Sequence, residues 1–509
     1  MNLVIDNQLV TLDVLRRVWQ EPVQVSIGGK AKVRIAEANE LVDDVVAGGD
    51  RVYGVNTGFG QLAQVKIETD ELAQLQENLV RSHAVGVGEL LTDETVRLIM
   101  LMKVIALAEG FSGVRLTLVE ALCGLINNEI YPCIPSQGSV GASGDLAPLA
   151  HMAGVLLGIG DVRVGQAIMP ASAALQHAGL KPITLGPKEG LALLNGTQVS
   201  TALALTAVFR TENLIAGGLV AGAISSDAVQ GSDTPFDKRI QNVRGHGGQT
   251  AVAGVLRELM HGSDIRASHI ECDRVQDPYS IRCQPQVMGA CLDVLRHVCT
   301  VLETEANAVT DNPLVFTDSN SVLSGGNFHA EPVALAADYL ALAIAEIGAL
   351  SERRIALLID SHMSGLPAFL VKDGGLNSGF MMAQVTAAAL ASENKSHAHP
   401  ASVDSLPTSA NQEDHVSMAT YAGRRLHTML DNVANIIAIE LLAAAQGIEF
   451  HHPKKSSPVI ESVIGEIRSL SPVFEEDRSL SNDIRLVADS INRGAYAEHA
   501  ASILPSLST

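Results

Sequence analysis

The chain has 509 residues, of which 47 % are hydrophobic and only 3 % aromatic, so its core must be built mostly from aliphatic side chains. Its formal net charge of −21 argues against nucleic acid or an anionic membrane as a partner, because both need a cationic surface. This length allows about three domains, or fewer if one large helical core absorbs the chain. We therefore expect a water-soluble globular protein.

Six cysteines are present and none forms a CxxC pair: Cys123, Cys133, Cys272, Cys283, Cys291 and Cys299. In a chain this long they do not indicate a disulfide framework, so a reducing cytoplasm is the expected location. The first residues lack a basic segment followed by an apolar run, so we expect no secretory signal. The longest apolar run, residues 332–350, contains Asp338 and Glu346, and it is interpreted as a core helix rather than a membrane span.

The first part of the chain, residues 1–110, has a mixed texture. Short β-rich pieces such as residues 23–35 alternate with helical pieces such as residues 68–86. This alternation predicts a small mixed N-terminal region.

The rest of the chain, residues 111–509, is dominated by long Ala- and Leu-rich segments, among them residues 331–359, 381–395 and 423–447. Helices that are apolar on nearly all faces are buried on several sides. Small Ala side chains let such helices approach closely. The predicted fold is therefore mainly α, a long-helix bundle, with apolar surface available for burial between subunits.

Polar, glycine-bearing segments interrupt this helical background, and such segments tend to carry binding and catalytic groups. The residues with useful chemistry in them are Tyr53, Ser143, Asn195, Gln276, Tyr279, Arg282, Phe328 and Glu413. They comprise phenols, a cation suited to a carboxylate, amides, an aromatic wall and one acid. Histidines at 397–399 and 451–452 faintly resemble metal ligands, but no Cys or acid completes either set, so no metal is expected.

The segment "GSVGASGDLAPLAH", residues 138–151, has three glycines around Ser143. It is one residue short of the Gly-x-Ser-x-Gly nucleophile elbow, and it lacks the lysine of a phosphate-binding loop. As an ordinary loop it would end at a helix N-capped by Asp145, with Pro148 in the first turn.

A tight turn at this place has a further chemical possibility. If the Gly144 amide nitrogen meets the Ala142 carbonyl carbon, the backbone can close a five-membered ring, because glycine has no side chain to block the approach. Loss of one water from the ring and one from the Ser143 hydroxyl leaves an exocyclic methylidene on an imidazolone. That group is an electrophile, which no ordinary side chain supplies.

The same segment resembles the signature of the aromatic amino-acid ammonia-lyases and aminomutases, in which Ala-Ser-Gly becomes 4-methylidene-imidazol-5-one (MIO). Further segments resemble the family in the same order along nearly the whole chain: "YGVNTGFG", "LLNGTQ", "QDPYSIRCQPQ", "DNPLVF", "GGNFHAEP" and "NQEDHVSM". The stretches around His83 and Glu413 resemble the histidine-specific members.

The resemblance implies a mostly helical homotetramer whose active sites are each shared between subunits, and an MIO group formed from Ala142, Ser143 and Gly144 with no external cofactor. It implies the conversion of L-histidine to trans-urocanate and ammonia, the first step of histidine degradation. Two other hypotheses stay open at this point. One is a tyrosine or phenylalanine ammonia-lyase or 2,3-aminomutase with the same chemistry, and the other is a helical scaffold in which Ala-Ser-Gly never cyclises.

The resemblance also implies roles for single residues. Tyr53 takes the β-proton of the substrate, a task for which a phenol of ordinary pKa about 10 needs a polarising site. Tyr279 assists proton transfer, and Arg282 holds the substrate carboxylate in a bidentate pair. Asn195 and Gln276 bind polar groups.

Phe328 is expected beside the substrate ring as a wall, and His83 and Glu413 are expected to read the imidazole. Each of these residues also has an ordinary structural explanation. Tyr53 could be a turn residue, and Asn195 could cap the end of a helix. Arg282 could be a partner in a structural ion pair, and His83 could be a hydrogen-bonded histidine of the interior.

Overall fold

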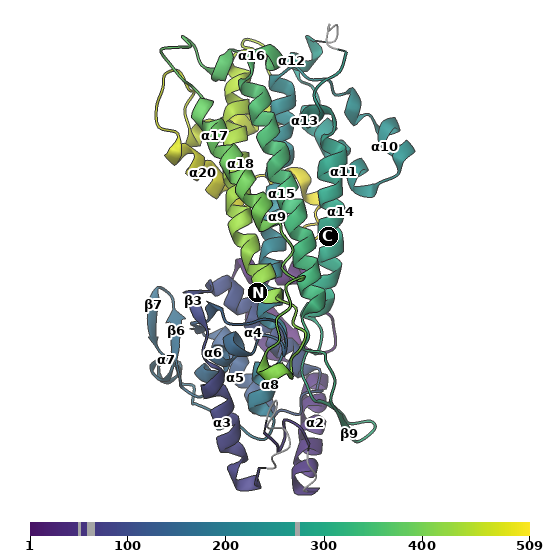
Figure 1. Cartoon of the computed structure of the whole chain (residues 1–509), viewed down its shortest axis with the longest axis vertical. Helices are drawn as coiled ribbons and strands as arrows, with labels where there is room; N and C mark the ends of the chain where they lie inside the picture. Colours follow the sequence, from purple (N-terminus) through teal and green to yellow (C-terminus); the bar gives the residue numbers. More distant parts are fainter. Residues whose placement is uncertain (49–51, 59–66, 270–274, 509) are drawn as a thin grey trace. The chain divides into compact units, whose positions relative to one another are not determined.

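The computed structural model describes residues 1–48, 52–58, 67–269 and 275–508. The chain is mainly helical, as predicted (Figure 1). It divides into two compact units. The first contains Met1–Thr206, Cys299–Asp338 and Pro400–Arg424, and the second contains Ala207–Val298, Tyr339–His399 and Arg425–Thr509. The predicted boundary at residue 110 stays a prediction.

The first unit combines short helices with small sheets. Its helices are α1 Leu12–Gln20, α2 Gly29–Gly48, α3 Leu72–His83, α4 Asp93–Ala108, α5 Leu116–Asn127, α6 Leu146–Leu156, α7 Ala171–His177 and α8 Glu189–Leu194. Its strands are β1 Asn2–Ile5, β2 Gln24–Ile27, β3 Val87–Leu90, β4 Tyr131–Pro132, β5 Pro135–Gln137, β6 Asp161–Val164, β7 Ala167–Pro170, β8 Leu314–Phe316 and β9 Ser321–Leu323.

The sheets of the first unit are small and mostly antiparallel. Strands β1 and β2 pair in parallel, with Leu3 opposite Val25. Strands β4, β6 and β7 form an antiparallel three-stranded sheet, while β3 pairs with β5 and β8 with β9. The prediction that short strands alternate with helices in the N-terminal region is confirmed. The β-rich interpretation of residues 23–35 is wrong beyond Ile27, because α2 begins at Gly29 and its face bearing Ala31 and Ile35 is buried.

Helix α4 runs through the interior of the first unit. Its N-cap residue is Thr92, whose hydroxyl accepts a hydrogen bond from the Thr95 amide. Acidic side chains occupy its first turn, where the positive end of the helix dipole stabilises them. Every residue from Thr95 to Ala108 is buried, including the two cations Arg97 and Lys103.

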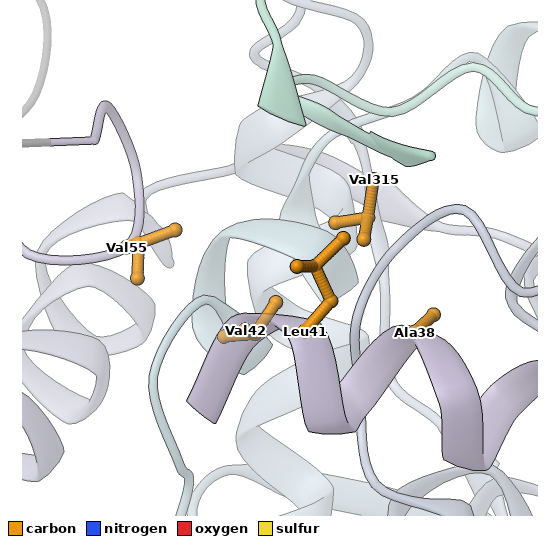
Figure 2. Close-up of a cluster of buried hydrophobic side chains, with 5 residues drawn as sticks. All are labelled: Ala38, Leu41, Val42, Val55 and Val315. Atoms are coloured by element: carbon orange, nitrogen blue, oxygen red, sulfur yellow. The ribbon is translucent and has the colours of Figure 1, made fainter. Parts of the chain in front are cut away.

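A small apolar cluster supports the segment that carries Tyr53. Figure 2 shows Ala38, Leu41 and Val42 along one face of α2, with Val55 and Val315 completing the group. Val55 is fully buried there. Because Val55 lies two residues after Tyr53, its burial fixes the backbone next to that phenol.

The second unit is built on long helices. Its own helices are α10 Lys238–Arg244, α11 Gly247–Met260, α12 Asp264–Ala267, α13 Tyr279–Arg282, α16 Ser361–Ser364, α17 Met381–His397, α19 Pro458–Leu470 and α20 Ser481–Asn492. Four long helices have residues in both units: α9 Gln198–Ala228, α14 Gln284–Ala306, α15 Glu331–Ile359 and α18 Ala419–Glu449.

The long helices approach closely at glycines, which confirms the predicted bundle. A Cβ placed on Gly218 of α9 would lie 3.4 Å from Met288 of α14, 3.6 Å from Ile437 of α18 and 3.8 Å from Ile347 of α15. Figure 1 shows these helices side by side. The bundle also buries an ion pair in which Arg354 donates to Glu440, 2.8 Å between Nη2 and Oε2.

Among the residues that the structure describes, three helices are long and apolar enough to cross a membrane by length and composition alone. They are α9, α15 and α18, and the most apolar window of each is 94 %, 67 % and 83 % buried inside the protein. The run at residues 332–350 lies within α15. Helix α17 differs from the prediction of burial on several sides, because it buries a single face with Ala387 and Ala391 and leaves Met382 64 % exposed.

Cys123, Cys133, Cys283 and Cys291 are free thiols. Cys272 lies outside the described residues.

Candidate active site

A cavity of about 1050 Å³ in the first unit gathers most of the predicted site residues. Its lining includes Tyr53, His83, Ala142, Ser143, Asn195, Phe328 and Glu413. These residues come from separate segments of the chain, and each segment except the end of α3 is irregular backbone next to a helix. The sequence indicates these residues one by one, and the fold places them around one cavity.

The glycine-rich turn around Ser143 is bent and tightly packed. Gly141 and Gly144 have φ of +66° and +72°, a region that L side chains rarely adopt. A Cβ on Gly144 would lie only 2.3 Å from the carbonyl oxygen of Gly196. Only glycine fits at position 144, and the positive φ angles of Gly141 and Gly144 allow the chain to turn here.

Asp145 joins this turn to two other segments of the chain, those of Ser200 and Thr420. It stands at the N-cap position of α6 but makes no side-chain cap bond, so the predicted capping role is wrong. Its fully buried carboxylate instead accepts bonds from the hydroxyls of Ser139 at 2.8 Å, Thr420 at 2.6 Å and Ser200 at 2.9 Å. A buried charge needs such partners, and here they hold the residue after Gly144 in place.

The Ser143 hydroxyl donates a short hydrogen bond to Oε1 of Glu413. The other oxygen of Glu413, Oε2, accepts a 2.6 Å bond from the hydroxyl of Thr408. The carboxylate is thereby aimed at the serine, and it can accept a proton or an N–H group at that place.

Asn195 lies on the other side of Ser143. Its side-chain nitrogen donates a 2.8 Å bond to the Ser143 carbonyl oxygen, and the residue is only 4 % exposed. Its side-chain oxygen is buried and has no hydrogen-bond partner among the described residues. A buried polar atom without a partner is uncommon in a folded protein and is suited to a group that the chain itself does not supply.

His83 ends α3 at the cavity wall. Its Nδ1 lies 3.0 Å from the Ser82 hydroxyl. Burial lowers the pKa of the His83 imidazole below 6.5, against smaller opposing effects of the Leu79 carbonyl and of Glu413. The backbone just beyond His83 is fixed to α6, because the Gly86 amide donates to Nε2 of His151 at 3.1 Å.

Three predicted residues, Gln276, Tyr279 and Arg282, belong to the second unit and do not line this cavity. Tyr279 is 70 % exposed, and the Arg282 guanidinium lies 4.6 Å from the centre of its ring. Gln276 and Arg282 line a separate cavity of about 600 Å³ in the second unit. A single chain therefore places only some of the predicted site residues at the Ser143 cavity, and Gln276, Tyr279 and Arg282 are not among them.

Two residues that support the site from behind were not predicted from the sequence. Thr408 holds Glu413, and Lys103 contacts the backbone of Asn195 at 2.7 Å. A cation inside the otherwise apolar stretch that follows Arg97 in α4 is a signal that could have indicated Lys103. Thr408 has no such signal, because its role depends on the folded loop.

One further cluster joins residues far apart in the chain. Ligating atoms of His329, Glu331 and His415 lie within 4.8 Å of one another, and two histidines with a carboxylate are a set that can hold zinc. Two of these residues are also in direct contact, since His329 Nε2 lies 3.2 Å from the carbonyl oxygen of His415. The histidine pairs noted in the sequence do not contribute to this cluster.

Comparison with known proteins identifies the class. The family described as aromatic amino acid lyase matches residues 10–469. The chain is 59 % identical to the histidine ammonia-lyase of Vibrio cholerae over 95 % of both chains. It also resembles the crystal structure of histidine ammonia-lyase from Trypanosoma cruzi, with a TM-score of 0.91 and 43 % identity over 99 % of this chain and 96 % of that one.

A tyrosine aminomutase from Streptomyces globisporus is similar in fold as well, with a TM-score of 0.93 and 34 % identity over 98 % of both chains. The chain belongs to the aromatic amino acid lyase family. It has the mainly helical ammonia-lyase fold.

Proposed function

We propose that this protein is a histidine ammonia-lyase, which eliminates ammonia from L-histidine to give trans-urocanate as the first step of histidine degradation. The observation that carries the proposal is the convergence of Ser143, Glu413 and His83 on one cavity. Curated relatives that are 59 % and 60 % identical to this chain bear that name. The free thiols of Cys123, Cys133, Cys283 and Cys291 agree with a cytoplasmic location.

The proposal includes an MIO group formed from Ala142, Ser143 and Gly144. The residues present fit such a group. The turn is bent at Gly144, the Ser143 hydroxyl is hydrogen-bonded to the Glu413 carboxyl, a group that can move a proton to or from the serine as water is lost, and Asn195 has a buried oxygen with no hydrogen-bond partner in the described part of the chain. Once formed, the group supplies an electrophilic carbon that makes the substrate amine a better leaving group.

The remaining chemistry falls to side chains of the chain. The Tyr53 side chain lies at the cavity wall, where its phenolate form can receive the β-proton of the substrate. Asn195 holds the carbonyl at Ser143, and Phe328 bounds the space for the ring.

Glu413 and His83 are proposed to select the imidazole. An imidazole ring has two nitrogens, and each needs a partner once it is removed from water. The Glu413 carboxylate accepts a hydrogen bond from a ring N–H. His83 has a pKa below 6.5 and is therefore neutral near pH 7, so its ring can pair with the other nitrogen as acceptor or donor.

We propose further that the active form is a homotetramer and that a neighbouring copy supplies Gln276, Tyr279 and Arg282 to each cavity. The support is that these residues are absent from the lining of the Ser143 cavity. Co-expression of Ser143→Ala and Arg282→Ala chains tests this, because mixed tetramers would contain intact sites and recover activity. Inactive mixed tetramers would contradict shared sites.

The alternative is a tyrosine or phenylalanine lyase or aminomutase, which the 34 % identity to a tyrosine aminomutase favours. Product absorbance measured in parallel with histidine, tyrosine and phenylalanine separates these functions. Greater turnover of tyrosine or phenylalanine than of histidine would overturn the proposal. A near-ultraviolet difference spectrum after borohydride treatment tests the MIO group, since an uncyclised loop has no methylidene to reduce.

A further inference from the structure

Lys103 is a fully buried cation that the proposed chemistry does not use. It lies in the middle of α4, and its side chain is among the largest in the protein with almost no solvent exposure. Its ammonium donates two hydrogen bonds, at 3.1 Å to the carbonyl oxygen of Ala192 and at 2.7 Å to that of Asn195.

These two carbonyls lie at the end of the short helix α8. The last carbonyls of a helix have no partner within the helix, and a cation is favoured at that end. The chain turns sharply here, because Asn195 has extended φ and ψ of −82° and 127° and Gly196 has a φ of +140°. Lys103 therefore contacts the backbone at the point where the helix ends and the contact with the Ser143 turn begins.

The surroundings of Lys103 are strongly polar for an interior. Lys188 and Asp311 form an ion pair of 2.5 Å nearby, with side chains 0 % and 4 % exposed. Burial lowers the pKa of the Lys103 ammonium to about 7; Lys188 adds to this effect, while the charges of Asp311 and Asp145 oppose it. A lysine kept in such a place must contribute contacts that an apolar residue could not make.

We propose that Lys103 is a positioning residue for the MIO site, and that it fixes the Asn195 backbone so that the Asn195 side-chain amide meets the Ser143 carbonyl. This inference rests on the proposed function. The chain of contacts runs from the Lys103 ammonium to the Asn195 carbonyl, and from the Asn195 amide to the Ser143 carbonyl at 2.8 Å. Without Lys103, two buried carbonyls lose a donor and Asn195 is free to shift.

A double-mutant cycle on the full-length enzyme tests the inference, with Lys103→Met, Asn195→Ala and the double variant. Intact mass reports ring formation, since the mature chain lacks the mass of two water molecules, and kcat and KM with histidine are measured alongside. We expect Lys103→Met to lower kcat by about a hundredfold, the effect of a displacement of about 1 Å at a catalytic site. In the Asn195→Ala background the same change should lower kcat less than about threefold, because the residue acts through Asn195.

Leu101→Ala is the matched control, because Leu101 is equally buried on the same helix and lies outside the cavity lining. It should lower the melting temperature while its effect on kcat adds to that of Asn195→Ala. Additive effects of Lys103→Met, or an unchanged kcat, would overturn the inference.

Lys103→Gln replaces Lys103→Met if the latter does not fold. If both fail to fold while Leu101→Ala folds, Lys103 is a folding residue and the inference is wrong. Wild-type chain that retains the mass of both water molecules would instead contradict the proposed MIO group, so the two failures are distinguishable.

Discussion

The side-chain amide of Asn195 and the carbonyl oxygen of Ser143 are joined by a hydrogen bond of 2.8 Å, although the two residues are 52 positions apart in the chain. Together with the Ser143–Glu413 contact, this bond places the serine between an amide donor and a carboxylate acceptor. The first two predictions below follow from that arrangement.

Ser143→Ala should lower activity on histidine by about three orders of magnitude or more, because it removes the hydroxyl whose loss forms the methylidene. The circular dichroism spectrum should stay helical. The near-ultraviolet difference after borohydride should vanish in the variant. Turnover close to that of the wild type would exclude the MIO mechanism.

Glu413→Ala should depress kcat/KM on histidine much more than any residual activity on phenylalanine. An unpaired ring nitrogen costs about 1–3 kcal/mol, which corresponds to roughly ten- to a hundredfold. Thr408→Val should act in the same direction but more weakly, since it removes only the 2.6 Å bond that orients Glu413. Kinetics on both amino acids and a melting curve decide the matter. Equal losses on both substrates together with a lower melting temperature would indicate a structural role.

Arg282→Lys should raise KM for histidine clearly, because lysine keeps the charge but lacks the planar fork that pairs with a carboxylate. Arg266→Lys is the control, since Arg266 lines the same second cavity but is already paired with Asp233 at 2.7 Å. Steady-state kinetics should separate the two variants. If Arg282→Lys leaves KM and kcat unchanged, another cation holds the substrate.

His83 should make stability depend on pH just below neutrality. Its folded-state pKa is lowered by burial, so between that pKa and 6.5 the unfolded chain binds more protons than the folded one. Stability from this residue is fully present above pH 6.5 and is lost as the pH falls through the folded pKa. Urea unfolding of the wild type and of His83→Gln should give free energies of unfolding whose difference changes with pH in this window. A constant difference would contradict the lowered pKa.

Glu440→Gln should destabilise the bundle by about 3–5 kcal/mol, because it leaves the buried Arg354 guanidinium without its carboxylate. Asp489→Asn is a suitable comparison, since its ion pair with Arg485 is exposed and should contribute no more than about 1 kcal/mol. Denaturant unfolding measures both. Similar small losses in the two variants would show that the buried pair contributes little.

Much of the fold could be predicted from periodicity and composition. The apolar stretch at 331–359 coincides with α15, because helix formation there depends on local propensity and on a pattern that repeats every turn. The β-rich interpretation failed at residues 29–35, where "GKAKVRI" also fits a helix with one buried face. Burial of that face against the rest of the first unit selected the helix.

The candidate site divides in the same way. The loop "GSVGASGD" shows its chemistry in the sequence, because ring closure needs only three consecutive residues with glycine at the third. Three features depend on contacts between residues 55 to 275 positions apart: the carboxylate that faces Ser143, the hydroxyls of Ser200 and Thr420 that hold Asp145, and the buried lysine that supports Asn195. Such contacts arise only when segments distant in the chain pack together, so only the tertiary structure decides them.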